Sequence, residues 1–228
     1  MAKNTFIALK VREFLERHEG SVLLEHELKG LLKDIGLPVP KGIFIGKNGH
    51  IPKLSLSYPL VAKVTSSSII SKTEVKGIRL DIKDKEGLNQ AVRELLEIKD
   101  AEGVLVEEMA KEGLEVIVGG TLDEQFGPVV MFGLGGVFVE TFRDISFALS
   151  PLNRQDAYEL IRQTKGCKLL EGRRGISYDI DALIKIIIAV GKIISSGFIE
   201  EIDLNPIRIY KEGAIILDAK TKAKRNRY

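Results

Sequence analysis

The sequence has no tryptophan, one cysteine and three histidines among its 228 residues. A single cysteine cannot form an internal disulfide, so we expect a reducing compartment, the cytoplasm. Aromatic residues make up 6% of the chain and its net charge is +2, so we expect no nucleic-acid partner. The apolar run at 186–190 is far too short to span a bilayer, and charged residues interrupt the N-terminal segment. We therefore expect no signal peptide and no membrane association.

What the sequence does contain is the composition of a globular protein, with 44% hydrophobic and 29% charged residues. This length suits one large domain or two lobes that share a cleft. Short apolar strands are mixed with amphipathic helices without strict βαβ alternation, which indicates an α+β fold. We predict strands at about 42–46, 60–64, 77–82, 104–107, 114–119, 128–132 and 137–141, and helices at about 5–18, 22–35, 85–99, 153–165 and 179–195.

A hairpin near the C-terminus has polar residues where a buried strand usually has valine or isoleucine. Asp203 and Asn205 are two residues apart, so their side chains project from one face of the strand. If Glu212–Gly213 is a two-residue turn, Asp218 falls opposite Ile207 and one pleat from Asn205. A few oxygen ligands, with room for waters or phosphates, suit Mg²⁺ better than zinc or calcium. The alternative is a polar pair that caps the hairpin.

Three charged residues interrupt or border the apolar strands. Lys63 lies within the strand predicted at 60–64, where an ammonium requires a route to solvent or an anionic partner. A nucleotide phosphate would serve as that partner; the alternative is an edge-strand lysine that discourages aggregation. Glu107 and Glu115 stand at strand ends, where they could accept hydrogen bonds from ribose or adenine. Ordinary solvation of strand ends is the alternative for both.

Gly135 and Gly136 lie in a glycine-rich segment, 132–136, between two predicted strands. A dinucleotide fingerprint must open a helix, so this segment is not one. Glycine lets backbone N–H groups approach an anion closely, and the alternative is a tight β-turn.

Combined, these segments resemble the ATP-grasp subunit of the ADP-forming acyl-CoA synthetases, commonly the β subunit of an acetate–CoA ligase. The resemblance covers about 22–221 and is carried by the segments 107–109, 113–119, 125–128, 132–136, 169–175 and 201–206. It implies an ATP-grasp fold, in which two α+β lobes enclose a nucleotide cleft. We accordingly predict a helical extension at 1–20, lobes at 21–107 and 108–221, and a basic tail at 222–228.

The resemblance also implies roles for individual residues. Lys63 would contact the nucleotide phosphates, and Glu107 and Glu115 would border the adenosine. The predicted nucleotide-binding residues are Lys63, Glu107, Glu108, Met109, Glu115, Gly135 and Gly136. Asn205 and Asp218 would hold Mg²⁺, with Asp203 in support. The substrates on this side of the enzyme would be ATP and ADP.

The implied reaction converts acyl-CoA, ADP and phosphate into a free acid, CoA and ATP, reversibly. In the family the phosphoryl group passes through an acyl phosphate and a phosphohistidine on a partner α subunit. That partner carries the CoA and acyl sites, and the family implies an α2β2 heterotetramer. Phosphoryl transfer requires mainly positioning and charge neutralisation, so this chain requires no nucleophile.

One position departs from the family. Ser71 stands where we expect a histidine that acts as a second phosphoryl carrier, and a serine ester gives up its phosphoryl group far less readily. The explanations are an engineered substitution, which the otherwise intact motif favours, a partner histidine that reaches the nucleotide directly, or nucleotide binding without turnover. Two alternative functions follow: a non-catalytic nucleotide-sensing subunit, and a succinate–CoA ligase β subunit with the same Asn/Asp metal pair. The segments 125–128 and 132–136 favour the acetate–CoA ligase.

Overall fold

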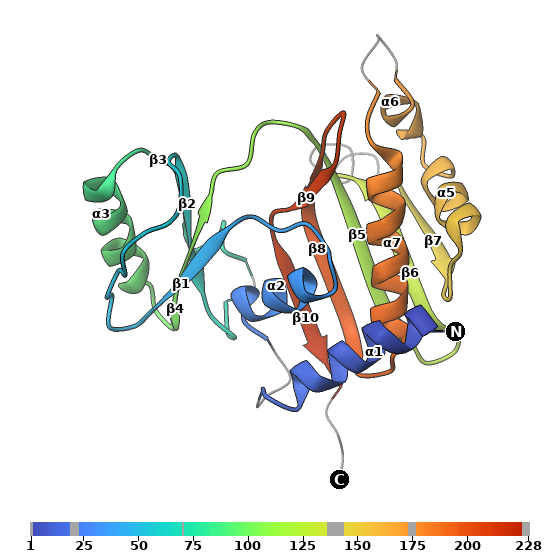
Figure 1. Cartoon of the computed structure of the whole chain (residues 1–228), viewed down its shortest axis with the longest axis horizontal. Coiled ribbons are helices and arrows are strands. Elements are labelled where there is room, and N and C mark those ends of the chain that lie inside the picture. Colours follow the sequence, from blue (N-terminus) through green and yellow to red (C-terminus); the bar gives the residue numbers. More distant parts are fainter. Residues whose placement is uncertain (1, 19–22, 70, 136–143, 173–176, 225–228) are drawn as a thin grey trace. The chain divides into compact units, whose positions relative to one another are not determined.

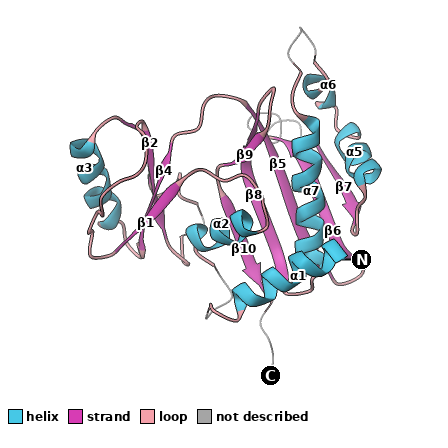
Figure 2. Cartoon of the chain, in the orientation of Figure 1, coloured by secondary structure: helices cyan, strands magenta, loops and turns pink. Residues whose placement is uncertain are grey.

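The computed structural model describes residues 2–18, 23–69, 71–135, 144–172 and 177–224. Its helices and strands are intermixed along the chain (Figure 2). They form two compact units. The large unit comprises Met1–Leu23, Leu28–Val39 and Glu112–Tyr228, and the small unit comprises Leu24–Glu27 and Pro40–Lys111. The domain boundaries predicted at 20, 107 and 221 stay a prediction.

In the described part of the small unit, one antiparallel sheet has the strand order β1-β4-β2-β3. Its strands are β1 (Gly42–Gly46), β2 (Leu60–Thr65), β3 (Ile78–Ile82) and β4 (Gly103–Glu108). Helix α3 (Lys85–Leu96) begins after Asp84, whose side chain accepts a hydrogen bond from the Gly87 N–H at 2.8 Å. Its buried residues recur at helical spacing, so one face of α3 packs on the sheet.

Side chains of β2 alternate between the two faces of this sheet. Leu60, Ala62 and Val64 are buried in the same core as α3. Lys63 therefore projects from the opposite face, and so does Glu107 on β4, which follows the buried Val106. The face without α3 thus receives the charged residues of both strands.

The large unit contains a second antiparallel sheet, which among the described residues has the order β10-β8-β5-β6-β7, with β9 also paired to β8. Its strands are β5 (Leu114–Asp123), β6 (Gly127–Leu134), β7 (Ile145–Leu149), β8 (Ile199–Ile209), β9 (Ala214–Ile216) and β10 (Ala219–Ala223). The remaining helices are α1 (Ala2–Leu15), α2 (Glu25–Asp34), α5 (Arg154–Arg162), α6 (Cys167–Leu170) and α7 (Ile180–Ser195). Helix α2 crosses the division between the units, because Glu25–Glu27 are grouped with the small unit.

Helix α7 lies along one face of the large sheet (Figure 1). An almost continuous apolar surface on α7 packs against β5, β6 and β8, and α1 packs against α7. A Cβ atom on Gly120 of β5 would lie 2.7 Å from the Ile194 side chain, so glycine permits this close approach. The opposite face of β5 and β8 carries polar residues, because side chains alternate along each strand.

The register of the C-terminal hairpin differs from the prediction. Tyr210 donates its N–H to the carbonyl of Gly213, so Lys211–Glu212 rather than Glu212–Gly213 form the turn. Ile207 therefore pairs with Ile216, and the N–H of Asn205 donates to the carbonyl of Asp218 at 3.2 Å. The prediction that Asp218 lies opposite Ile207 was wrong.

A bulge interrupts the pairing of β8 with β5 beside Asn205. Val116 of β5 pairs with Ile207 while Val118 pairs with Leu204, so β8 has one extra residue in this interval. Both Leu204 and Ile207 are fully buried in the core. Asn205 therefore lies in the bulge between them, on a strand whose neighbouring side chains point inward.

Most predicted elements agree with the structure to within a few residues, including β1, β2 and α7. The strand predicted at 137–141 lies outside the described residues. Within the described ranges, no helix has the length and hydropathy required to cross a membrane.

Candidate functional site

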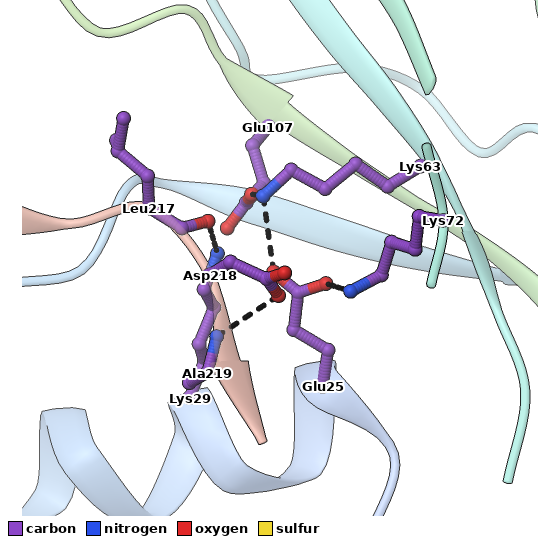
Figure 3. Close-up of polar contacts among 8 residues, drawn as sticks. All are labelled: Glu25, Lys29, Lys63, Lys72, Glu107, Leu217, Asp218 and Ala219. Carbon is purple, nitrogen blue, oxygen red and sulfur yellow. Dashed lines mark hydrogen bonds and ion pairs between the residues drawn. The ribbon is translucent and has the colours of Figure 1, made fainter. Parts of the chain in front are cut away.

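Four charged side chains meet in the small unit (Figure 3). The Nζ atom of Lys63 lies 2.8 Å from Glu107 Oε2 and 3.0 Å from Glu25 Oε1. The other oxygen of Glu25, Oε2, lies 2.9 Å from the Nζ atom of Lys72. Two ammonium groups and two carboxylates therefore form a chain of ion pairs in the order Lys72, Glu25, Lys63, Glu107.

This arrangement removes the alternative explanations for Lys63 and Glu107. Strand β2 lies between β4 and β3, so Lys63 is not on a sheet edge. Glu107 is only 2% exposed, so solvation of a strand end does not account for it. Lys63 pairs with Leu105, two residues from Glu107 on the same strand, which makes Lys63 and Glu107 diagonal neighbours on one face. Buried charges require partners of opposite sign, and each supplies one to the other.

Glu108 and Met109 follow at the end of β4 and beyond it. Their N–H groups donate to the carbonyls of Lys41 and Pro59 at 2.9 and 3.0 Å. The Glu108 carboxylate accepts a hydrogen bond from the Ser57 N–H at 3.0 Å, and the Met109 side chain is 37% exposed. If an adenine base binds beside this segment, the N–H groups of Glu108 and Met109 therefore already have carbonyl partners.

In the large unit, Glu115 on β5 faces Arg208 on β8 at a directly paired position. The Nε and Nη2 atoms of Arg208 both lie 3.0 Å from Glu115 Oε1. Both side chains are partly exposed, so this carboxylate remains accessible on the sheet face that α7 does not cover.

Gly135 follows β6 and lies against the start of β5. Its N–H donates to the carbonyl of Glu115 at 2.7 Å. A Cβ atom at Gly135 would lie 2.9–3.0 Å from Glu115, mainly from its backbone, so the close approach of two chain segments requires glycine here. Gly136, the second predicted glycine, lies outside the described residues.

The three predicted metal ligands lie on β8 and at the break between β9 and β10. Asn205 and Asp218 occupy directly opposed positions, as their backbone hydrogen bond shows. Asp203 precedes Asn205 by two residues and pairs with Lys220 on β10. In the described part of the chain, no group of three or more His, Cys, Asp or Glu residues could hold a metal ion. One amide and one carboxylate fit Mg²⁺, which retains several waters and binds through one or two carboxylates together with phosphates.

The surroundings of Asp203 affect its protonation. Burial raises the pKa of the Asp203 carboxyl above its ordinary value, and the nearby carboxylates of Asp218 and Glu201 raise it further. The ammonium of Lys220 opposes this shift. A divalent cation held by Asn205 and Asp218 would offset the negative charge that contributes to the raised pKa of Asp203.

Lys29, which the sequence analysis did not select, is a buried lysine that contacts the backbone between β9 and β10. The Nζ atom of Lys29 on α2 donates to the carbonyl oxygen of Leu217 at 2.7 Å (Figure 3). Lys29 is 5% exposed. Leu217 immediately precedes Asp218, so this hydrogen bond fixes the backbone beside a predicted metal ligand.

Ser71 begins a short turn in the loop between β2 and β3. Its Oγ atom accepts a hydrogen bond from the Glu74 N–H at 3.4 Å, and the Gly77 N–H donates to the carbonyl of Lys72 at 2.6 Å. Serine at the first position of such a turn satisfies a backbone donor. Ser71 is adjacent in sequence to Lys72, whose side chain enters the ion-pair chain.

Sequence reasoning missed Glu25, Lys72, Lys29 and Arg208. Glu25 has the ordinary place of an acidic residue in the first turn of a helix, which gave no reason to select it. Lys72 lies in a polar loop segment beside Ser71, where a lysine is an ordinary surface residue. Lys29 alone carried a usable signal, because it lies among apolar residues on the buried side of α2.

A family model described as an ATP-grasp domain matches residues 15–222. The chain belongs to the ATP-grasp family. The predicted α+β ATP-grasp fold is therefore confirmed.

This ATP-grasp chain is 40% identical over 224 residues to the β subunit of ADP-forming acetate–CoA ligase I from Pyrococcus furiosus, covering 92% of this chain and 97% of that protein. It is 41% identical over 201 residues to ADP-forming acetate–CoA ligase II from Archaeoglobus fulgidus, covering 87% of this chain but 30% of that protein. The ATP-grasp chain thus corresponds to nearly all of the first relative and to about a third of the second.

A solved structure of acetyl-coenzyme A synthetase 1 from Ca. Korarchaeum cryptofilum is also similar to this ATP-grasp chain. The sequence identity is 37% and the TM-score is 0.80, and the match covers 94% of this chain and 100% of that one. That protein is in complex with coenzyme A and Mg-AMPPCP, and its phosphohistidine segment points towards the nucleotide-binding site.

Proposed function

We propose that this chain is the nucleotide-binding subunit of an ADP-forming acyl-CoA synthetase of the acetate–CoA ligase type. The enzyme would convert acyl-CoA, ADP and phosphate into a free acid, CoA and ATP, reversibly. The observation that carries the proposal is the alignment with the Pyrococcus furiosus β subunit along almost the full length of both chains.

Lys63 would exchange part of its ion pairing for the phosphates, while Glu107 and Glu115 would accept hydrogen bonds from the adenosine. The residues assigned to the nucleotide are Lys63, Glu107, Glu108, Met109, Glu115, Gly135 and Gly136. Buried, preorganised charges of this kind suit phosphoryl transfer, which depends on positioning and charge neutralisation.

Asn205 and Asp218 would hold Mg²⁺, and Asp203 would support them. When bound, the ion neutralises charge on the phosphates. The chain's own contribution is to fix the two oxygen donors at opposed strand positions, with Lys29 anchoring the backbone at Leu217. These assignments rest on the donor chemistry and on the resemblance of the segments that carry them.

The partner would be an α subunit that carries the CoA and acyl sites and a phosphohistidine, in an α2β2 assembly. The Korarchaeum relative supports this route, because its phosphohistidine segment points towards a nucleotide-binding site. If the partner's phosphohistidine reaches the nucleotide in the same way here, Ser71 need not carry a phosphoryl group.

Ser71 also supports a second candidate, a subunit that binds nucleotide without turnover. Serine in place of the expected histidine would interrupt a two-histidine relay while leaving the nucleotide-binding residues unchanged. The two functions differ in one respect, which is whether the chain supports ATP formation when its α subunit is present.

Calorimetric titration of the chain with ADP and ATP, with and without Mg²⁺, tests the shared part of both functions. We expect binding that requires Mg²⁺ and that is lost in an Asn205→Ala/Asp218→Ala variant. Binding that the variant leaves unchanged would contradict the metal assignment, and absence of binding would contradict the nucleotide site.

Reconstitution with the α subunit then separates the candidates. ATP formation from acetyl-CoA, ADP and phosphate by the unchanged chain would establish the direct route. Activity that arises only in a Ser71→His variant would establish the relay and show that Ser71 interrupts it. Nucleotide binding without ATP formation in either case would favour the sensing subunit.

A further inference from the structure

Strand β7 lies at one edge of the large sheet (Figure 1). Among the described residues it pairs with β6 alone, and from Ile145 to Leu149 it contains neither a charged residue nor a proline. We propose that this edge pairs with the same edge of a second copy of the chain, in an antiparallel, two-fold arrangement centred on Phe147. The inference goes beyond the proposed function and does not depend on nucleotide binding.

The two faces of β7 differ in burial. The Ser146 hydroxyl donates to a backbone carbonyl of α5 at 2.6 Å, and Ala148 packs against the core. Side chains alternate along a strand, so Ile145, Phe147 and Leu149 share the opposite face. They are 37%, 57% and 58% exposed, respectively. Three large apolar side chains on one face of an edge strand are therefore in contact with water.

The outward-pointing backbone groups of β7 belong to the same three residues. Ser150 donates its N–H to the carbonyl of Pro128 on β6 at 2.8 Å. Backbone groups alternate in direction along a strand, so every second residue from Ser150 back along β7 bonds towards β6. The N–H and C=O groups of Ile145, Phe147 and Leu149 therefore point away from β6, where an added strand would meet them.

Other sheet edges of the chain carry features that discourage such pairing. Strand β10, at the opposite edge of the large sheet, presents the exposed side chains of Lys220 and Lys222. Strand β3, at an edge of the small sheet, contains Arg79 and Asp81, and Asp81 has a left-handed backbone with φ 55°. Charged side chains and irregular backbone protect sheet edges from association. Strand β7 instead keeps a regular register with β6 and carries no charge.

The sequence of β7 is suited to pairing with itself. In an antiparallel pair centred on Phe147, this residue lies opposite its own copy, and Ile145 lies opposite Leu149 of the other copy. All these residues have outward-pointing backbone groups, so each pair can exchange both N–H···O bonds. The apolar side chains then meet on one face, with an aromatic pair at the two-fold axis. A shift of the register by one residue would lose both features.

The contact area sets the strength of this pairing. With about 200 Å² for each large apolar side chain, the exposed fractions amount to about 300 Å² per copy. Two copies would bury about 600 Å², half of the roughly 1,200 Å² at the lower limit of stable interfaces. Main-chain hydrogen bonds add affinity, as in other cases of strand addition. We therefore expect a weak dimer of the isolated chain, and in the proposed α2β2 assembly the same contact would join the two β subunits.

The two-fold arrangement also limits the size of the assembly. A dimer of this kind uses the β7 edge of both copies, so the interface is closed and leaves no β7 edge for a third chain. The remaining edge of the large sheet is β10, where Lys220 and Lys222 oppose further addition. We therefore expect dimers without larger species.

Sedimentation velocity of the full chain, from micromolar to millimolar concentrations, provides the first test. The variant Phe147→Lys places two ammonium groups side by side at the two-fold axis, where like charges repel. Phe126→Lys is the matched control, because Phe126 is 66% exposed in the turn between β5 and β6 and the change of charge is the same. Far-UV circular dichroism checks that each variant is folded.

Disulfide cross-linking of Phe147→Cys, in a Cys167→Ser background, provides a second test that captures a weak dimer. Directly opposed residues of a hydrogen-bonded antiparallel pair have Cα atoms about 5.5 Å apart, which a disulfide can bridge. Phe126→Cys in the same background is the control for random collisions.

We expect the dimer fraction of the unchanged chain to rise with concentration. Phe147→Lys should raise the dissociation constant of the dimer by about tenfold or more, because it removes the central aromatic contact. Phe126→Lys should stay within about twofold of the unchanged chain, since surface changes outside an interface have little effect on binding. On mild oxidation Phe147→Cys should form a covalent dimer, and Phe126→Cys should remain largely monomeric.

Several outcomes would overturn the inference. A chain that stays monomeric at every concentration, with no cross-link through Phe147→Cys, would show that β7 does not pair with itself. Equal effects of Phe147→Lys and Phe126→Lys would place the contact elsewhere, and species larger than a dimer would contradict the closed two-fold arrangement. If the unchanged chain is monomeric but Phe147→Lys loses binding of the α subunit, the edge belongs to that partner.

Discussion

Replacing Lys63 by methionine tests whether the buried ion pairs stabilise the small unit. Methionine keeps an unbranched side chain of similar length but removes the ammonium. Glu107, which is 2% exposed, then loses its ion pair at 2.8 Å, while the ion pair between Glu25 and Lys72 remains. Among the four side chains of this ion-pair chain, the substitution therefore leaves two carboxylates and one ammonium.

Breaking a buried pair by removing one partner costs about 3–5 kcal/mol. Domains are stabilised by only about 5–15 kcal/mol, so the loss is a large part of the total. With an m-value of about 3 kcal/mol/M, the urea midpoint should fall by about 1–1.7 M. Adding Glu107→Leu to Lys63→Met removes the stranded carboxylate, so the double variant should recover about 1–3 kcal/mol relative to additivity.

Urea unfolding without nucleotide, followed by far-UV circular dichroism, provides the measurement, because the chain has no tryptophan for fluorescence. Lys83→Met, which breaks an exposed pair, should stay within about 0.5 kcal/mol of the unchanged protein. The reasoning is refuted if Lys63→Met has an equally small effect, or if the two substitutions prove additive.

Three further outcomes follow from the large unit. The raised pKa of Asp203 means that its charged form is disfavoured in the folded protein. Asp203→Asn should therefore stabilise the Mg²⁺-free chain at pH 7. Thermal melts should show this gain in stability shrinking as the pH falls towards 3.8. The pKa of Asp179 is shifted in the opposite direction, because hydrogen bonds from the N–H groups of Gly213 and Ala182 lower it. The Asp179 carboxylate therefore stabilises the fold above pH 3.8, and this contribution is lost as the pH falls through the lowered pKa. Asp179→Ala should cost about 1 kcal/mol near neutral pH and almost nothing in acid, and an equal loss at both pH values would contradict the reasoning. Gly135→Ala should cost about 1–3 kcal/mol in urea unfolding, because the new methyl group meets the Glu115 backbone; no loss would show that the two segments can separate freely.

Local patterns gave much of the fold. The apolar periods of β1, β2 and α7 were sufficient to place these elements, because hydrophobic side chains recur at the spacing of the secondary structure that buries them. The hairpin register was not predictable in this way. A turn one residue earlier than expected moved Asp218 opposite Asn205, and a bulge at Asn205 shifted β8 against β5. Neither feature has an unambiguous signal in the sequence.

For the candidate site, the sequence selected Lys63 and Glu107 as separate anomalies but did not pair them. Their pairing depends on the register of β2 against β4, which joins residues 44 positions apart. Glu25 and Lys72 were missed because an acidic residue at a helix start and a lysine in a loop are ordinary features of protein surfaces. Only burial makes them unusual.

By itself, then, the sequence determined which segments form strands and helices, the likeness to ATP-grasp subunits, and the residue types available for phosphate and Mg²⁺. The tertiary structure decided which of these charges neutralise one another: Glu25 with Lys63 and Lys72, Lys63 with Glu107, and Glu115 with Arg208. The physical reason is that secondary structure follows from interactions between near neighbours in the chain. The energy of a charge depends instead on its burial and on partners brought close by strand pairing and helix packing.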